Sequence, residues 1–312
     1  MAETVGIRYG GMDRGRLTAF PTTSRIDHMG RNAILEVTDD GLVCPEVGAW
    51  TESKHSFASL YAKLFSSGMK EKWHKRVYLE LYAGAGYSRV RGTSRVIAGS
   101  PLRALTLEHP FDEYVFCEEN PENVRALKAR VERHAPGASV EYVEGDCNKK
   151  VGEILARIPV GSRTDTVLTL CFVDPFDIGI EFETIRRLSV RFIDFLVLLA
   201  VFMDANRNYD RYIKAGDVRV EKFLGSNSWR DRWCIAQQSG ASFPRFLASE
   251  YDKSMESLRY LDTPLHTMHK VRSDEKNLPL YYLALFSRHK RAYEFWDEAQ
   301  KYGTDQTQFN WG

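Results

Sequence analysis

The sequence predicts an α/β protein built on a doubly wound, mostly parallel sheet. Apolar, β-prone runs alternate with amphipathic helical segments through the middle of the chain. The run Ile193–Phe202 is almost continuously apolar, as a central parallel strand should be. The β-prone run Val77–Tyr82 ends in a turn of small residues. Near the C-terminus, Thr267–Arg272 and Leu280–Phe286 predict an antiparallel hairpin.

The elements are expected in a simple order along the chain. Residues 1–46 are glycine-rich and irregular, and we expect an arm or a small flanking subdomain. Residues 47–312 form the main domain, with a helical insertion around residues 204–262. The remaining strands are expected at Tyr114–Glu118, Val140–Val143 and Val167–Val173. Helices are expected from Trp50, after Ser100, and at Pro121–His134, Lys149–Ile158, Glu181–Leu188, Val218–Trp233, Phe243–Tyr260 and Ala292–Tyr302, the last stopped by Gly303.

Composition excludes several classes of protein. The 312 residues carry a formal net charge of +1, so no global basic field points to nucleic acid. The longest apolar run, Phe195–Met203, is too short to span a bilayer, and no signal-peptide pattern is present. The five cysteines are not spaced as a zinc site or a disulfide framework. We therefore expect a cytoplasmic protein with no metal site and no membrane association.

The turn after Val77–Tyr82 has the composition of a cofactor-binding loop. Gly84 and Gly86 allow close backbone approach to a ligand, and Glu80 places an acid inside the apolar strand. A dinucleotide fingerprint requires a third glycine where this chain has Arg89, and an acid about 20 residues on. S-adenosylmethionine (SAM) has no pyrophosphate and does not need that glycine, so the pattern favours SAM over NAD. A turn that merely connects strand to helix is the alternative.

Acidic residues follow four successive predicted strands. Parallel strands end at one edge of a sheet, so Glu80, Glu118, Asp146 and Asp174 are expected to form a rim there. Glu80 would lie under the methionine amino group, Glu118 would accept both ribose hydroxyls, and Asp146 would meet the adenine amino group. Lys54 is a candidate for the cofactor carboxylate, or else a solvated lysine. The expected cofactor-binding residues are thus Glu80, Tyr82, Gly84, Gly86, Glu118, Asp146 and Lys54.

The tripeptide Asp174-Pro175-Phe176 is the candidate catalytic motif. Methyl transfer is an in-line displacement, so the acceptor lone pair must point at the methyl group. The Asp174 carboxylate and the following backbone carbonyl would hold an acceptor amine, and the ring of Phe176 would stack on a base. A simple turn after a strand is the alternative interpretation.

Basic and polar residues beside this edge are candidate substrate contacts. Arg89, Arg91 and Arg95 lie in a long connection, Tyr87–Gly99, which we expect to be an extended loop that meets phosphates. Asn206 and Arg207 lie in the polar loop 204–217 and are also candidates. A protein partner or plain solvation would account for the same arginines.

Seven motifs, in order, resemble the three-Cys-motif partner family. They are Val47–Lys54 (VGAWTESK), Tyr78–Gly86 (YLELYAGAG), Ala98–Pro101 (AGSP), Cys117–Asn120 (CEEN), Gly145–Asn148 (GDCN), Phe172–Phe176 (FVDPF) and Tyr281–His289 (YYLALFSRH). The resemblance implies a Rossmann-like, class I SAM-dependent methyltransferase fold. It also implies a separate partner protein that resembles radical-SAM enzymes.

Three functions remain open from the sequence. The leading one is a SAM-dependent methyltransferase that acts on nucleic acid. The second is a binding subunit that keeps the fold but lacks catalysis. The third, an NAD(P)-dependent oxidoreductase, is disfavoured by Arg89 and by the distance along the chain to Glu118.

Overall fold

The structure is a computed structural model that describes residues 36–273 and 277–308. These residues belong to one compact unit, Ala33–Gly312, and the other unit, Met1–Asn32, lies outside the described residues. The expected arm or subdomain at residues 1–46 is therefore described only from residue 36, and its boundary stays a prediction.

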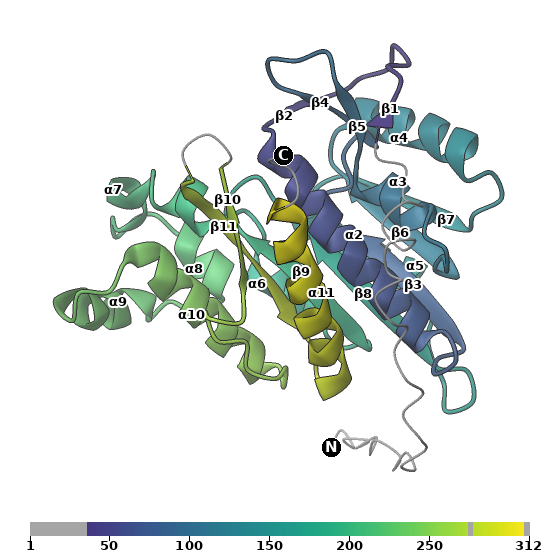
Figure 1. Cartoon of the computed structure of the whole chain (residues 1–312). Coiled ribbons are helices and arrows are strands. Elements are labelled where there is room, and N and C mark those ends of the chain that lie inside the picture. The colour runs from purple at the N-terminus through teal and green to yellow at the C-terminus, as the bar shows by residue number, and fades with distance from the viewer. Residues whose placement is uncertain (1–35, 274–276, 309–312) are drawn as a thin grey trace. The chain divides into compact units, whose positions relative to one another are not determined.

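A seven-stranded sheet with the order β10-β11-β9-β8-β3-β6-β7 forms the centre of the described unit (Figure 1). The five strands from β9 to β7 run parallel, whereas β11 pairs antiparallel with β9 and with β10. The fold class predicted from the sequence is thus confirmed. The strands are β3 (Lys75–Glu80), β6 (Glu113–Glu118), β7 (Val140–Glu144), β8 (Val167–Val173), β9 (Ile193–Leu199), β10 (His269–Arg272) and β11 (Pro279–Phe286).

Helices cover both faces of this sheet because strand residues alternate between two apolar cores. In β3, Val77 and Leu79 face one core and Tyr78 faces the other. One face carries α2 (Trp50–Met69), α3 (Ser100–Leu105), α4 (Pro121–His134) and α11 (Lys290–Gln308). The opposite face carries α5 (Cys147–Arg157), α6 (Phe182–Leu188), α8 (Arg219–Leu224), α9 (Trp229–Gln238) and α10 (Phe243–Ser257).

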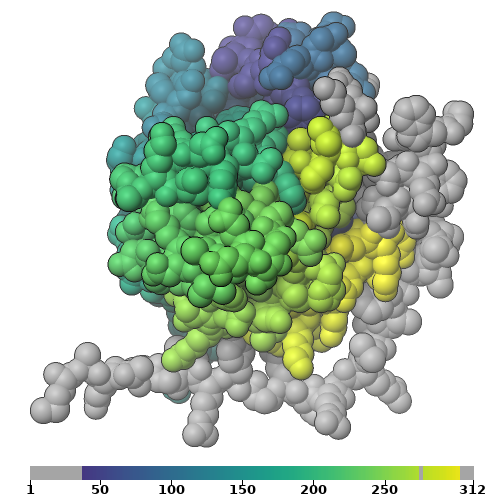
Figure 2. Space-filling model, turned by 90° about the vertical axis from the view of Figure 1, so that its left-hand side faces the viewer, coloured from purple at the N-terminus to yellow at the C-terminus, as the bar shows by residue number. Residues whose placement is uncertain are grey.

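The predicted helical insertion lies between β9 and β10. It starts with a π-helix, η1 (Val201–Ala205), and contains α7 (Tyr209–Tyr212), α8, α9 and α10. Figure 2 shows its residues, coloured green, as one continuous surface. The single helix expected at Val218–Trp233 was wrong: Gly225 takes a left-handed conformation (φ +63°) and ends α8, as glycine commonly does at a helix C-terminus.

A second, four-stranded sheet includes two strands from the segment expected to be an extended loop. Its order is β1-β5-β4-β2, built from β1 (Glu36–Val37), β2 (Glu46–Val47), β4 (Tyr87–Val90) and β5 (Val96–Ala98). The connection Tyr87–Gly99 is therefore mainly a hairpin, and the loop expectation was wrong. Its apolar residues Val90, Val96 and Ile97 are buried, which explains why the segment pairs instead of extending into solvent.

Several predicted boundaries were also wrong, and two of them have a clear physical reason. β9 ends at Leu199 and continues into η1, because a buried apolar run has no periodicity that separates strand from helix. Helix α11 continues past Gly303 to Gln308. A single glycine within a helix costs only about 1 kcal/mol relative to alanine, so it need not stop one.

Candidate functional site

The four predicted acids lie at one edge of the central sheet. Glu80 and Glu118 are the last residues of β3 and β6, Asp146 follows β7, and Asp174 follows β8. These strands are parallel neighbours in the order β8-β3-β6-β7, so their carboxyl ends meet. We call the four acids the strand-end rim.

The glycine turn is open on one side and anchored on the other. Gly84 and Gly86 have φ values of +64° and +82°, which glycine adopts without strain. A Cβ on Gly84 would meet nothing within 4 Å, whereas one on Gly86 would lie 3.0 Å from Leu127 Cδ1. The Gly84 N–H donates to Glu118 Oε2 at 2.8 Å. The turn thus leaves space beside Gly84 while Glu118 fixes its position.

Glu118 is held in place yet keeps acceptor capacity. Its Oε1 accepts from the Asn120 N–H and from Asn123 Nδ2, both at 3.0 Å. A carboxylate has about four acceptor positions, and the described residues use three. One position on Oε2 is therefore available to a hydroxyl donor.

Asp146 serves first as a helix cap. Its Oδ1 accepts from the Asn148 N–H at 2.9 Å, and Lys149 Nζ lies 3.2 Å from Oδ2. The cap starts α5 at Cys147, two residues before the expected helix, because a helix needs its first N–H groups satisfied. Tyr82 lies nearby, half-buried after β3, and burial beside Cys147 raises its pKa.

Glu80 is fully buried and is bonded by neutral groups. The Ser100 hydroxyl donates to Oε1 at 2.5 Å, and the Tyr78 hydroxyl donates to Oε2 at 3.1 Å. Burial raises the pKa of Glu80 well above its ordinary value, and the neighbouring charge of Asp174 adds to this. Ser100 was expected to cap α3, but Gly99 is the cap and the Ser100 hydroxyl bonds Glu80 instead.

Lys54 and Asp174 form a nearly buried ion pair. Lys54 Nζ lies 2.6 Å from Oδ2 and 2.9 Å from Oδ1, so both carboxylate oxygens are engaged. Only 10% and 11% of the two side chains are exposed, so the solvated-lysine interpretation was wrong. Burial alone would raise the pKa of Asp174, but the charge of Lys54 and the proximity of His55 hold it below its ordinary value.

His55 completes this cluster as a neutral ring. Its Nε2 lies 3.8 Å from Asp174 Oδ2. Burial lowers the pKa of His55 to about 4, so the imidazole is uncharged at neutral pH. Its Nδ1 has no hydrogen-bond partner among the described residues.

The loop after β8 presents Phe176 to solvent. The Phe176 side chain is 88% exposed, whereas Pro175 is buried. The loop backbone is fixed by Asp204, a residue of η1, whose Oδ2 accepts from the Ile178 N–H at 3.0 Å. Arg219 Nη1 donates to Asp177 Oδ2 at 2.8 Å. The exposed ring is therefore held on an anchored backbone.

The other predicted substrate contacts lie on the surface. Asn206 and Arg207 directly follow η1 and are exposed. The three arginines of the predicted loop each pair with an acid: Arg89 with Asp39, Arg91 with Glu46 at 4.0 Å, and Arg95 with Glu52. Their charges are partly neutralised by these pairs. Contact of these residues with phosphates stays a prediction.

Sequence reasoning missed three side chains that shape this site: His55, Ser100 and Asp204. His55 directly follows Lys54, but a lone histidine in a helical segment carries no functional signal. Ser100 was assigned to the helix N-terminus, where serine is common. Asp204 lay in a segment expected to be an irregular loop, although π-helical turns often occur at functional sites.

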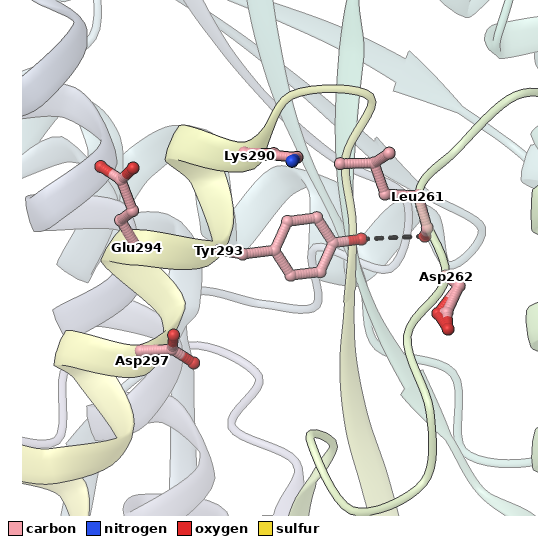
Figure 3. A pocket seen from close by; sticks show the side chains of 6 residues that line it. All are labelled: Leu261, Asp262, Lys290, Tyr293, Glu294 and Asp297. Carbon is pink, nitrogen blue, oxygen red and sulfur yellow. Dashed lines mark hydrogen bonds between the residues drawn. The ribbon is translucent and has the colours of Figure 1, made fainter.

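A separate hollow of about 520 Å³ lies elsewhere in the described unit (Figure 3). Its lining residues are Leu261, Asp262, Lys290, Tyr293, Glu294 and Asp297. The Tyr293 hydroxyl donates to the Leu261 carbonyl at 3.0 Å across it. α11 begins shortly after the end of β11, where Phe286 pairs with Phe195 near the start of β9. The hollow is thus at the opposite edge of the sheet from the strand-end rim.

We expect Glu80→Gln to change the pH dependence of stability. The pKa of Glu80 is raised in the folded protein, so the unfolded chain loses the proton at lower pH and wild-type stability falls as pH rises above about 4.3. Glutamine has no proton to lose, so the unfolding free energy should shift in the variant's favour as pH rises above about 4.3. Urea unfolding at several pH values measures this. Glu119→Gln, at the exposed acid that directly follows Glu118, is the control, and a pH-independent difference for Glu80→Gln would contradict a raised pKa of Glu80.

No family model matches the chain, and no curated protein matches it. Several solved structures are similar. An O-methyltransferase from Bacillus cereus in complex with SAH has 12% identity over 74% of this chain and 80% of that chain, with a TM-score of 0.42. TomG, an O-methyltransferase from Streptomyces achromogenes in complex with SAM, has 13% identity over 81% and 92% of the chains and a TM-score of 0.40.

A protein from Legionella pneumophila with the family name DUF519 has 16% identity over 55% of this chain and 74% of that chain, with a TM-score of 0.38. At these scores, the ligands of those proteins say nothing of what this chain binds. Within the part of the chain that the structure describes, no helix has the length and apolarity needed to cross a lipid bilayer.

Proposed function

We propose that the chain binds SAM at the strand-end rim and catalyses methyl transfer. The observation that carries this proposal is the open side of the glycine turn, where a Cβ on Gly84 would meet nothing while Glu118 fixes the turn and keeps a free acceptor position. This arrangement fits a nucleoside whose ribose hydroxyls donate to a carboxylate. When bound, SAM supplies a methyl group on a sulfonium.

The residues of the rim suit the parts of this cofactor. Glu118 would accept from one ribose hydroxyl at its free position on Oε2, and Asp146 would meet the adenine amino group beside the N-terminus of α5. Glu80 would lie under the methionine amino group, whose positive charge favours ionisation of that carboxyl. Lys54, with about a tenth of its side chain exposed, would bind the cofactor carboxylate.

The acceptor would approach between two anchored segments. Asp174 would accept a hydrogen bond from the acceptor group, and the exposed ring of Phe176 offers a flat surface for a base. Asn206 and Arg207 lie on the neighbouring connection, exposed toward a large substrate. We propose nucleic acid as the acceptor class. Methyl release from labelled SAM onto RNA, single-stranded DNA or protein tests this directly.

A second candidate is a binding subunit without catalysis. Both oxygens of Asp174 are engaged by Lys54, which is also what a purely structural ion pair would show. Together with the resemblance to the three-Cys-motif partner family, this suits a subunit of a complex with a radical-SAM-like partner. Binding of SAM without methyl release onto any of the tested acceptors would favour this candidate.

We expect Glu118→Ala to weaken SAM binding by about 1–3 kcal/mol, because a ribose hydroxyl would lose a charge-assisted hydrogen bond and the turn would lose its anchor at the Gly84 N–H. Calorimetric titration of both proteins with SAM measures the change. The control is Glu119→Ala, since that acid is the exposed neighbour on the same segment. Equal affinity of Glu118→Ala and wild type would contradict the assignment.

We expect the triple variant Arg89→Ala, Arg91→Ala and Arg95→Ala to reduce the salt dependence of nucleic-acid binding. Each phosphate that an arginine neutralises releases about one counterion, so the slope of log affinity against log salt should shrink by about three units. Oligonucleotide binding across a salt series measures the slope.

A triple variant of Arg125, Arg157 and Arg186 is a matched control, because each of these exposed arginines also pairs with an acid. Equal slopes for wild type and the Arg89 triple variant would remove the nucleic-acid role. Contact with a protein partner would then be the favoured interpretation of these arginines.

A further inference from the structure

Lys54 has two competing tasks in the proposed site. Its ammonium already binds both oxygens of Asp174, at 2.6 and 2.9 Å. A carboxylate held in this way has fewer lone pairs for an acceptor group, and a lysine held in this way is less available to an anionic ligand. Both side chains keep about a tenth of their area exposed, so a ligand at the rim can reach the pair.

Two other buried cations, on α2 and α3, bond no member of the strand-end rim. Arg103, on α3, is completely enclosed and donates to the Ala98 carbonyl and the Ser56 hydroxyl, and its Nη2 has no partner among the described residues. Lys63 also lies on α2, but nine residues on, which is about 13 Å along a helix. Of these three cations, Lys54 is the one that bonds a member of the strand-end rim, so a cofactor carboxylate there would meet it first.

We propose that Lys54 is a positioning residue that exchanges Asp174 for the carboxylate of the bound cofactor, so that Asp174 becomes available to the acceptor only after the cofactor has bound. This inference rests on the proposed function. The ammonium sits on a flexible four-carbon stem and can move between two carboxylates. Exchange of one carboxylate for another keeps the ammonium of Lys54 paired, while the Asp174 carboxylate loses its cation and becomes the free hydrogen-bond acceptor for the substrate. The site therefore imposes an order, with cofactor before acceptor.

The exchange predicts an unusual effect of a substitution at Asp174 on the affinity for the cofactor. In the free protein, only the fraction with Lys54 released from Asp174 would bind a carboxylate at full strength, so the pair lowers the apparent affinity. Asp174→Asn keeps the shape of the side chain but removes its charge. A substitution in the candidate catalytic residue should therefore strengthen binding of a ligand that carries the cofactor carboxylate.

The test compares two ligands that differ at the amino-acid end. S-adenosylhomocysteine carries the carboxylate, and 5′-methylthioadenosine lacks the amino-acid group altogether. By calorimetry, Asp174→Asn is expected to bind S-adenosylhomocysteine about tenfold more tightly than wild type, within the usual range of coupling between two sites. Its affinity for 5′-methylthioadenosine is expected to stay the same, which also shows that the site is folded.

Variants of Lys54 complete a double-mutant cycle with Asp174→Asn. Lys54→Met should bind S-adenosylhomocysteine more weakly without a matching loss for 5′-methylthioadenosine. In the double variant of Lys54→Met and Asp174→Asn, the gain should vanish, because the gain requires the lysine. Lys63→Met, which removes another buried lysine of α2, should leave the ratio of the two affinities at the wild-type value.

Two results separate failure of this inference from failure of the proposed function. If wild type binds both ligands but Asp174→Asn does not favour S-adenosylhomocysteine, Lys54 does not exchange partners and the inference is overturned while cofactor binding stands. If wild type binds neither ligand, the proposed function itself fails, and the inference falls with it. Should Lys54→Met fail to fold, Asp174→Asn retains the lysine and still decides the matter.

Discussion

Asp174→Ala is expected to reduce methyl transfer about 100- to 1,000-fold while SAM still binds. In the proposed site, the Asp174 carboxylate accepts a hydrogen bond from the acceptor group as charge develops on it. Removal of one preorganised polar group of this kind typically costs two to three orders of magnitude in rate. Because the interaction strengthens only in the transition state, the loss should appear in kcat. The affinity for SAM should not fall, and it should rise once Lys54 is released from Asp174 to the cofactor carboxylate.

The measurement is single-turnover methyl transfer from labelled SAM to an acceptor identified with wild type, beside calorimetric binding of SAM. Asp165→Ala is the control, since Asp165 is exposed and lies just before β8, at the opposite end of that strand from Asp174. That variant should retain most of the activity. Full turnover by Asp174→Ala would rule out a catalytic role for this residue.

Arg130→Met should lower the free energy of unfolding by about 3–5 kcal/mol, the range expected when one partner of a buried ion pair is removed. Arg130 is fully buried and donates to both oxygens of Asp40, whose side chain is 6% exposed. It also donates to the carbonyls of Val43 and Ala85, the latter in the glycine turn. The substitution leaves the buried Ala85 carbonyl without this donor and removes one of the two arginines that bond Asp40.

Arg133→Met provides the matched control. Arg133 Nη1 bonds the same Asp40 carboxylate at 3.0 Å, but its side chain is 51% exposed, so its loss should cost less than about 1 kcal/mol. Urea unfolding of the three proteins measures both effects, and equal costs would contradict the assigned importance of burial.

The same pair predicts a pH dependence. The hydrogen bond from Arg130 lowers the pKa of Asp40 to about 2. The folded pKa is depressed, so the stabilisation is present above the unfolded pKa of about 3.9 and is lost as pH falls toward 2. The difference between Arg130→Met and wild type should therefore be smaller at pH 3 than at pH 7.

Local signals were enough to predict most of the fold. The structure has α4 and β8 at the expected bounds, Pro121–His134 and Val167–Val173. In α4, Asn120 accepts from the Glu122 N–H and Pro121 occupies the first turn, so three consecutive residues specify where the helix starts. The strand β8 is bounded by polar residues on both sides. These signals come from residues that are close together in the sequence, so a single sequence is enough to detect them.

The contacts that could not be predicted join residues that are far apart in the sequence. The strand-end rim follows from topology alone, but the partners of its members do not. Lys54 and Asp174 lie 120 residues apart, and Arg130 and Asp40 lie 90 apart. The small sheet likewise depends on the pairing of β2 with β4, two short strands with little intrinsic preference. No periodicity within a segment signals these contacts.

The placement of β11 has a consequence for synthesis of the chain. Every residue of β9 is buried, and β11 covers its outer edge from Leu199 to Phe195. The ribosome adds about 80 residues between β9 and β11. At a synthesis rate of about 5–20 residues per second, the apolar edge of β9 therefore stays unpaired for several seconds. An uncovered edge strand is a template for pairing between chains. The C-terminal hairpin of β10 and β11 thus protects the edge of β9 from pairing with other chains. Nascent chains that stall before this hairpin is made would be prone to aggregate.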